Sequence, residues 1–221
     1  MMNAFEPQRT DILYYSINKV TFEEQFVRES LTQFVNKTQH PHRAIVIADT
    51  IKCLSYEIID RKKPAKARQM CLEAGDIIIG HIKRFCQDTK LEIAVYRWDD
   101  LINDPNYKTC YENITRELAV KPILKQKLTQ LSADFLKKRD GARPWKPQDI
   151  EVSVDFFVQE VPSFRKVSFK NVLIDRVFYT PEKMEIGEVT YQVLSEVGDG
   201  LTGIGEPAPH ELIRVQCIDQ A

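Results

Sequence analysis

Two short apolar runs decide the fold: residues 11–17, DILYYSI, and residues 43–49, RAIVIAD. Each is rich in β-branched or aromatic residues and has the length of a buried strand. Between them, Thr21 to Glu24 reads T-F-E-E, a capping box, and apolar residues then recur at helical spacing to about Asn36. The N-terminal part of the chain therefore predicts strand, helix, strand.

The rest of the chain continues this alternation. Strands are predicted over residues 91–97 and 171–179. Helices are predicted over residues 64–87, over residues 107–139 with a break near Pro122, and over residues 149–160. Residues 188–197 are compatible with a strand or a helix. Alternating strands and helices predict a Rossmann-like α/β fold, with a mostly parallel sheet flanked by helices in one domain spanning residues 1–221.

Composition excludes several classes of protein. The 221 residues are 43% hydrophobic and 29% charged, which excludes wholesale disorder. The net charge is −1, so a nucleic acid would have to meet a local basic patch. Five cysteines without a C-x-x-C pair argue against a disulfide scaffold and against a zinc ribbon. No run approaches the ~20 apolar residues of a membrane helix, and the N-terminus lacks a signal pattern. We therefore expect a cytoplasmic protein with no membrane contact.

Several familiar motifs fail on context. Gly198-x-Gly200-x-x-Gly203 matches a dinucleotide fingerprint by letter, but no helical pattern follows it. No phosphate-binding loop of the G-x-x-x-x-G-K type exists, so ATP use has no support, and there is no G-x-S-x-G elbow. The four histidines lack metal-ligand spacing. We expect neither a cofactor nor a metal.

Polar residues at predicted strand ends are the better candidates, because ligands of parallel α/β sheets gather at the carboxyl ends of strands. Ser16, Asp49, Trp98 and Tyr179 lie at or near such ends. Glu160 closes an otherwise apolar helix end, where a carboxylate is either a surface group or a functional one. From position alone, a serine bonded to its own backbone is the simpler interpretation of Ser16.

The order of these residues resembles that of the tRNA-dependent cyclodipeptide synthases. Ser16 follows the first strand as the family's nucleophile does. Four further segments match family motifs in order: Asp49 with Ala65–Arg68 and Glu73–Gly75; Arg97–Leu101 with Asp104, Pro105 and Tyr107; Val154–Pro162; and Val177–Tyr179. Four residues depart from the family pattern: Tyr14 replaces a glycine, Phe156 replaces a tyrosine, and Lys19 and Thr180 replace other family residues. The resemblance is to a divergent member.

The resemblance implies a fold like the catalytic domain of a class I aminoacyl-tRNA synthetase, and a two-substrate reaction. Ser16 would take an aminoacyl group from a first aminoacyl-tRNA, and a second aminoacyl-tRNA would complete a cyclic dipeptide. Glu160 and Tyr179 would be catalytic with Ser16, while Tyr14, Asp49 and Phe156 would bind substrate. The protein would act as a monomer or a homodimer.

Basic residues offer a surface for tRNA. Lys62, Lys63, Lys66 and Arg84 are the predicted contacts on or beside the long helix, and a second basic set occurs later in the chain: Lys125, Lys127, Lys137, Lys138 and Arg139. Without the resemblance, a solvated helix face is the better explanation of such basic residues. Two alternatives to the synthase stay open: a non-catalytic module that binds tRNA or a nucleotide, and an acyltransferase that moves one aminoacyl group to another acceptor.

Overall fold

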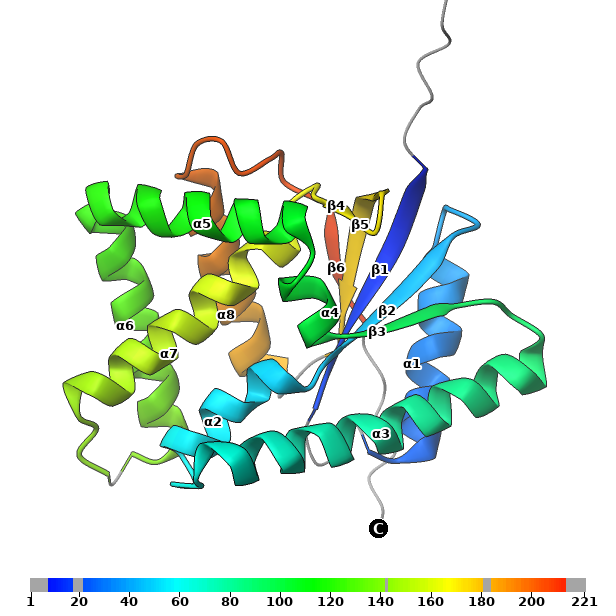
Figure 1. Ribbon diagram of the computed structural model, residues 1–221, viewed down its shortest axis with the longest axis horizontal. Coiled ribbons are helices and arrows are strands. Elements are labelled where there is room, and N and C mark those ends of the chain that lie inside the picture. Colours follow the sequence, from blue (N-terminus) through cyan, green and yellow to red (C-terminus); the bar gives the residue numbers. More distant parts are fainter. Residues whose placement is uncertain (1–7, 18–21, 142, 181–183, 214–221) are drawn as a thin grey trace, which may run out of the picture.

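A six-stranded sheet runs through the protein, with helices on both of its faces (Figure 1). The computed structural model describes residues 8–17, 22–141, 143–180 and 184–213. The strands are β1 (Arg9–Ser16), β2 (Arg43–Ala48), β3 (Ala94–Arg97), β4 (Ser168–Phe169), β5 (Val172–Tyr179) and β6 (His210–Leu212). The helices are α1 (Glu24–Lys37), α2 (Cys53–Ile58), α3 (Pro64–Thr89), α4 (Trp98–Ile102), α5 (Pro105–Val120), α6 (Pro122–Arg139), α7 (Pro147–Glu160) and α8 (Met184–Asp199).

The sheet reverses its direction of growth beside its central strand. The strand order is β3-β2-β1-β5-β4, and β6 pairs with β5. From β1 the chain builds outward through β2 to β3, and it then crosses to the other side of β1 to place β5. The β4–β5 pair is antiparallel, and the other pairs of named strands are parallel. The carboxyl ends of β1 and β5 therefore form a topological switch point.

Alternation along β1 separates two apolar cores. Leu13, Tyr15 and Ile17 pack in one core with residues of α1 and α3. Ile12 and Tyr14 pack in the other core, which contains residues of α4 to α8. Ser16 follows the same two-residue period and faces the second side.

Most predicted elements are confirmed, with shifted ends. The predicted helix over residues 107–139 is two helices that part at Lys121, because Pro122 cannot donate the backbone hydrogen bond that continuation requires. Residues 188–197 lie within a helix, α8. Strand β3 is shorter than predicted, and α2 and α4 were not predicted. Thr21 of the predicted capping box lies outside the described residues; the helix N-cap is Glu23, whose side chain makes no capping bond.

Candidate functional site

Ser16 and Tyr179 end adjacent strands at the switch point. Tyr179 is the last residue of β5, and its partner in the register of the two strands is Tyr14 of β1. The backbone N–H of Ser16 donates to the hydroxyl oxygen of Thr180 at 2.9 Å, and the backbone N–H of Thr180 donates to the Tyr14 carbonyl at 3.2 Å. Thr180 therefore holds the backbone of Ser16 at the edge of the sheet where proteins of this fold class bind ligands.

Tyr14 is buried on the same face, two residues before Ser16. Its ring packs edge-on against Trp98 with centroids 6.1 Å apart, and Trp98 packs in the same way against Tyr107 at 6.2 Å. The Tyr14 hydroxyl and the Trp98 indole nitrogen are both buried, with no hydrogen-bond partner among the described residues. Burial raises the pKa of the Tyr14 phenol, which therefore stays protonated at neutral pH.

Glu160 closes α7 near this aromatic group. The Tyr107 hydroxyl donates to the carbonyl of Gln159, the residue before Glu160, at 2.5 Å. Burial raises the pKa of Tyr107 well above its usual range, and the negative charge of Glu160 also raises it. Through its contacts with Trp98 and with the carbonyl of Gln159, Tyr107 joins the aromatic group beside β1 to the end of α7. The joint action of Ser16 and Glu160 on one substrate stays a prediction.

Asp49 has a structural role that the sequence did not indicate. Its carboxylate is 0% exposed, accepts from the backbone N–H groups of Thr50 and Trp98, and pairs with the Arg97 guanidinium. Burial raises the pKa of Asp49, while these bonds and the arginine oppose the rise. Gly75 allows α3 to pass over this pair, because a Cβ there would lie 2.7 Å from the carboxylate. Substrate binding by Asp49 stays a prediction.

Phe156 is packed into the core among other aromatic rings. Its ring stacks on Phe135 of α6, with centroids 6.3 Å apart and planes 16° apart, and contacts Phe157 edge-on. The residue is 6% exposed. This packing fixes α7 against α6, and contact with a substrate stays a prediction.

The structure separates the four cations predicted to bind tRNA. Lys62, Lys63 and Lys66 are exposed at the start of α3. Arg84 lies about 30 Å along the helix from Pro64, where it pairs with Glu24 of α1 at 3.1 Å. Lys19, a further departure from the family, lies outside the described residues.

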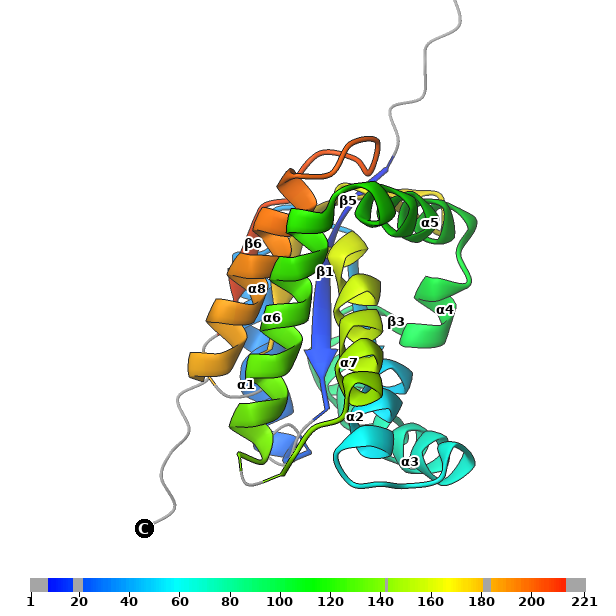
Figure 2. The ribbon, with the colours of Figure 1, turned by 90° about the vertical axis from the view of Figure 1, so that its left-hand side faces the viewer.

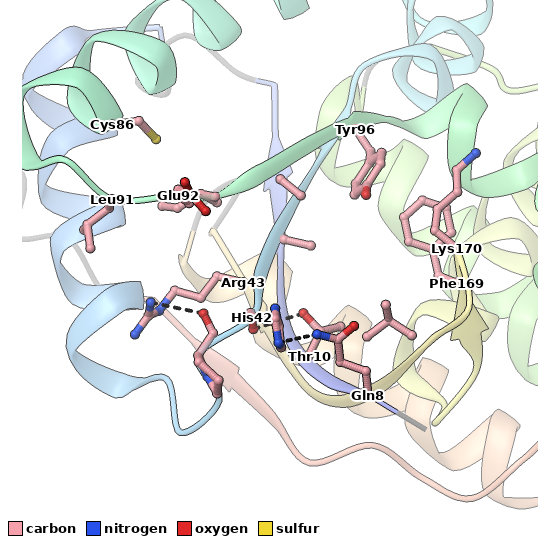
Figure 3. Close-up of a pocket in the computed structure, with 15 residues that line it drawn as sticks. Gln8, Thr10, His42, Arg43, Cys86, Leu91, Glu92, Tyr96, Phe169 and Lys170 are labelled. Atoms are coloured by element: carbon pink, nitrogen blue, oxygen red, sulfur yellow. Dashed lines mark hydrogen bonds between the residues drawn. The ribbon is translucent and has the colours of Figure 1, made fainter. Parts of the chain in front are cut away.

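Clefts open at both edges of the sheet. At the carboxyl edge, a cleft of about 370 Å³ lies between α2, the start of α3, α4 and Gln159, and is lined in part by Arg68, Trp98 and Asp99. At the amino edge, a cleft of about 650 Å³ lies beneath Tyr96 and Phe169 (Figure 3). Its polar groups contact one another: the Gln8 amide hydrogen bonds with the His42 ring.

Sequence reasoning missed the groups that support the site. The sequence indicates Thr180 only as a departure from the family, yet this residue holds the Ser16 backbone. Trp98 was named as a candidate because it follows a strand, and Tyr107 appeared only as a letter of a family motif. The sequence did not indicate that their two rings pack in series from Tyr14. No local signal joins Thr180 to Ser16, which are 164 positions apart.

The fold and its switch point define a Rossmann-like α/β protein with a ligand edge at the ends of β1 and β5. Neither a family model nor a curated relative matches the sequence. Solved structures do match across nearly the whole chain. A cyclodipeptide synthase from Staphylococcus haemolyticus has a TM-score of 0.68 at 15% identity, covering 92% of this chain and 89% of that one.

Two further structures agree. AlbC, a cyclodipeptide synthase from Streptomyces noursei, has a TM-score of 0.65 at 12% identity, covering 94% and 96% of the two chains. A Mycobacterium tuberculosis protein, whose structure relates cyclodipeptide synthetases to type I tRNA synthetases, has a TM-score of 0.68 at 13% identity, covering 92% and 84%. The chain therefore has the cyclodipeptide synthase fold, and the predicted fold class is confirmed. In the described part of the chain, no helix combines the length and the apolar character that crossing a bilayer demands.

Proposed function

We propose that the protein is a cyclodipeptide synthase that joins two aminoacyl groups delivered by tRNA in the cytoplasm. The observation that carries the proposal is the match of the whole fold, which covers 94% of this chain and 96% of AlbC. The placement of Ser16 at the switch point supports it independently, because a nucleophile is useful where the fold gathers its ligands.

Ser16 attacks the ester of the first aminoacyl-tRNA. A bond forms between the serine oxygen and the aminoacyl carbon, the bond to the tRNA hydroxyl breaks, and the serine proton passes to the leaving tRNA. The α-amine of a second aminoacyl-tRNA then attacks the aminoacyl-serine, so that a peptide bond forms, the serine ester breaks and the Ser16 hydroxyl is restored. Ser16 next attacks the ester of the resulting dipeptidyl-tRNA and releases the second tRNA, which gives a dipeptidyl-enzyme. The amine of the dipeptide closes the ring by attacking its own ester. Each amino acid arrives activated, so the proposed reaction consumes no nucleotide.

Orientation supplies much of the rate in such a reaction. When an amine and an ester are held in the correct orientation, their proximity lowers the activation barrier by roughly 7–11 kcal/mol. The Thr180 bond fixes the Ser16 backbone, and the buried aromatic group that begins at Tyr14 forms a wall two residues away. Glu160 holds the substrate ammonium, and Tyr179 orients the ester or relays a proton. Tyr14 and Phe156 bound the amino-acid pockets.

The experiment is to incubate the protein with radiolabelled aminoacyl-tRNAs and to look for an ester-linked adduct by intact mass. We expect an adduct on the wild type and none on Ser16→Ala. Ser168→Ala, at a half-buried serine of β4, is the matched control and should keep the adduct. An adduct that persists in Ser16→Ala overturns the assignment of the nucleophile.

The product distinguishes the alternatives. A cyclic dipeptide in the medium of expressing bacteria supports the synthase. A linear conjugate with Ser16 labelled indicates an acyltransferase to another acceptor. Bound tRNA with neither adduct nor product indicates a non-catalytic module and contradicts the proposal.

A further inference from the structure

Two cysteines that the proposed reaction does not use face each other between α2 and α3. Cys53 is the first residue of α2, Cys71 lies in α3, and both thiols are free. With Ala67 they form a small buried cluster, against which Tyr56 packs. Figure 2 shows α2 alongside the first turns of α3, near the carboxyl end of β1. The two thiols are joined by a hydrogen bond, so the pair has the proximity that a disulfide requires.

The two thiols differ in their access to solvent. Cys53 lines the cleft of about 370 Å³ at the carboxyl edge of the sheet, and the residue is 8% exposed. Cys71 is 0% exposed and does not line that cleft. A small dissolved oxidant can therefore reach the sulfur of Cys53 and not that of Cys71.

The surroundings favour a thiolate on Cys53. The hydrogen bond that Cys71 donates lowers the pKa of Cys53, and the Arg68 guanidinium lowers it further. Burial and the carboxylates of Glu57 and Asp49 act in the opposite direction without reversing the shift. The same hydrogen bond, together with burial, raises the pKa of Cys71. Because the thiolate is the reactive form of a cysteine, Cys53 is the nucleophile of the pair and Cys71 keeps its proton.

The remaining described cysteines lack this combination. Cys110 is buried, its thiol donates to the Ile204 carbonyl at 3.4 Å, and burial raises its pKa to about 11. Cys86 lines the cleft at the amino edge of the sheet, but burial raises its pKa as well. Among the described cysteines, Cys53 alone combines access from a cleft with a lowered pKa.

We propose that Cys53 and Cys71 form a redox pair that responds to peroxide, in which Cys53 is the site of oxidation and Cys71 is the resolving thiol. The Cys53 thiolate attacks one oxygen of hydrogen peroxide, the O–O bond breaks, and a sulfenic acid and a hydroxide ion result. The sulfur of Cys71 then attacks the sulfur of Cys53, the S–O bond breaks, and a disulfide forms. The protons of the two thiols leave with the two hydroxide groups as water. Two thiols are thus oxidised, and one peroxide is reduced to two molecules of water.

The test exposes the reduced full-length protein to hydrogen peroxide, blocks the remaining thiols by alkylation, and maps the tryptic peptides by mass spectrometry. Cys53 lies in the tryptic peptide of residues 53–61 and Cys71 in that of residues 69–83, and each peptide contains a single cysteine. We expect the two peptides to become linked, with a mass two hydrogens below their sum. Dithiothreitol should separate them again.

Two single variants separate the roles of the pair. In Cys71→Ser the sulfenic acid on Cys53 has no resolving thiol, so dimedone, which reacts with sulfenic acids, should label Cys53. In Cys53→Ser, Cys71 should resist peroxide and remain open to alkylation after denaturation. Arg68→Gln removes the neighbouring cation and should slow the loss of the Cys53 thiol severalfold, whereas Arg68→Lys should not.

The matched control is Cys110→Ser, at a buried cysteine outside the pair, which should form the linked peptide as the wild type does. Oxidation of Cys53 while the two peptides stay separate would show that Cys71 does not resolve it, and would overturn the proposal. Oxidation of Cys86 as fast as that of Cys53 would overturn it too, because Cys53 would then have no special reactivity. So would a bond from Cys53 to Cys217, which lies outside the described residues and belongs to a different tryptic peptide.

The wild-type result alone decides whether the pair forms, so a variant that fails to fold does not remove the test. None of these measurements involves tRNA or a cyclic dipeptide. A failure of the redox pair would therefore leave the proposed function as it stands, and a failure of the proposed function would leave the redox pair.

Discussion

The two faces of β1 are built for different purposes. Tyr15 faces α1 and α3 and is fully buried, and its neighbour Ser30 opposes the rise that burial causes in the pKa of its hydroxyl. Tyr14, its neighbour, faces the other helices, and its hydroxyl is buried without a partner among the described residues. The first face is an apolar core in which Ser30 of α1 is the polar neighbour of Tyr15. The second face contains buried polar groups without a described partner, such as the Tyr14 hydroxyl and the Trp98 indole nitrogen. Ser16, at the end of β1, lies on this second face.

The difference follows from how each face is assembled. The first face is covered by α1 and α3, which connect neighbouring strands, so its packing is specified by short stretches of sequence. The second face is covered by helices from the remainder of the chain, joined at a few close approaches. A site there is made of residues far apart in sequence. We expect substitutions on the first face to lower stability without changing activity. Substitutions on the second face should lower both stability and activity.

The largest effect should come from removing a ring on either face. Phe34 is fully buried against Phe178, with ring centroids 5.3 Å apart, and Phe156 is buried against Phe135. Each Phe→Ala change should lower the free energy of unfolding by about 3–5 kcal/mol through lost contacts and a cavity. Urea unfolding measures this cost.

The two faces are distinguished by the enzymatic activity of these variants. Phe34→Ala should leave the rate of product formation per folded molecule unchanged, while Phe156→Ala should lower it. Equal activities for the two variants, measured at a temperature where both are folded, would show that the faces do not differ in this respect.

This contrast also explains how far the sequence could be read. The apolar runs DILYYSI and RAIVIAD were enough to predict the first two strands, and the alternation of strands with helices was enough to predict a mostly parallel sheet. Ser16 and Tyr179 were predictable as candidates because each ends a strand. The Thr180 bond and the Arg61–Asp149 pair were not, because both depend on packing between segments that share no local pattern.

A second prediction compares two glycines. Gly198, in α8 on the second face, is so close to the buried Arg165 that an added Cβ would overlap the guanidinium of that residue. Gly198→Ala should cost about 1–3 kcal/mol of stability, as overpacking does. At Gly80, in α3, an added Cβ would have no described atom within 4 Å, so Gly80→Ala should raise stability by about 1 kcal/mol.

Thermal unfolding distinguishes the two signs. Destabilisation by both alanines would mean that Gly80 has a role that its open surroundings do not show. Stabilisation by both would mean that Arg165 can move aside, so that the close approach of α8 is not fixed by this glycine.

A third prediction uses the neighbouring tyrosines. The Tyr14 hydroxyl has no partner in the described part of the chain, and a buried group of this kind is costly. Tyr14→Phe should therefore raise the free energy of unfolding by about 1 kcal/mol. Tyr15→Phe should lower it by about the same amount, because it removes the hydroxyl that lies beside the buried Ser30. Chemical denaturation of the pair measures both. A loss of stability in Tyr14→Phe would show that its hydroxyl has a partner after all.

The smallest effect concerns the ion pair between Arg61 and Asp149, which joins the α2–α3 loop to the α6–α7 connection at the first turn of α7. The hydrogen bonds from Arg61 lower the pKa of Asp149, so the folded state binds its proton less readily than the unfolded state does. Its stabilisation is therefore complete above the unfolded pKa of about 3.9 and is lost as the pH falls through the lower folded value. Because Arg61 is half exposed, solvent screens the pair and its contribution is small.

Asp149→Asn should accordingly lower stability at pH 7 by less than any change above, and the difference from wild type should be smaller at pH 3 than at pH 7. Urea unfolding at pH 7 and pH 3 measures both values. Asp155→Asn, at an exposed position on the same helix, should leave stability unchanged at either pH. A deficit in Asp149→Asn that is as large at pH 3 as at pH 7 would mean that the residue acts through its N-terminal capping of α7, and that the charge on Asp149 does little to hold the two loops together.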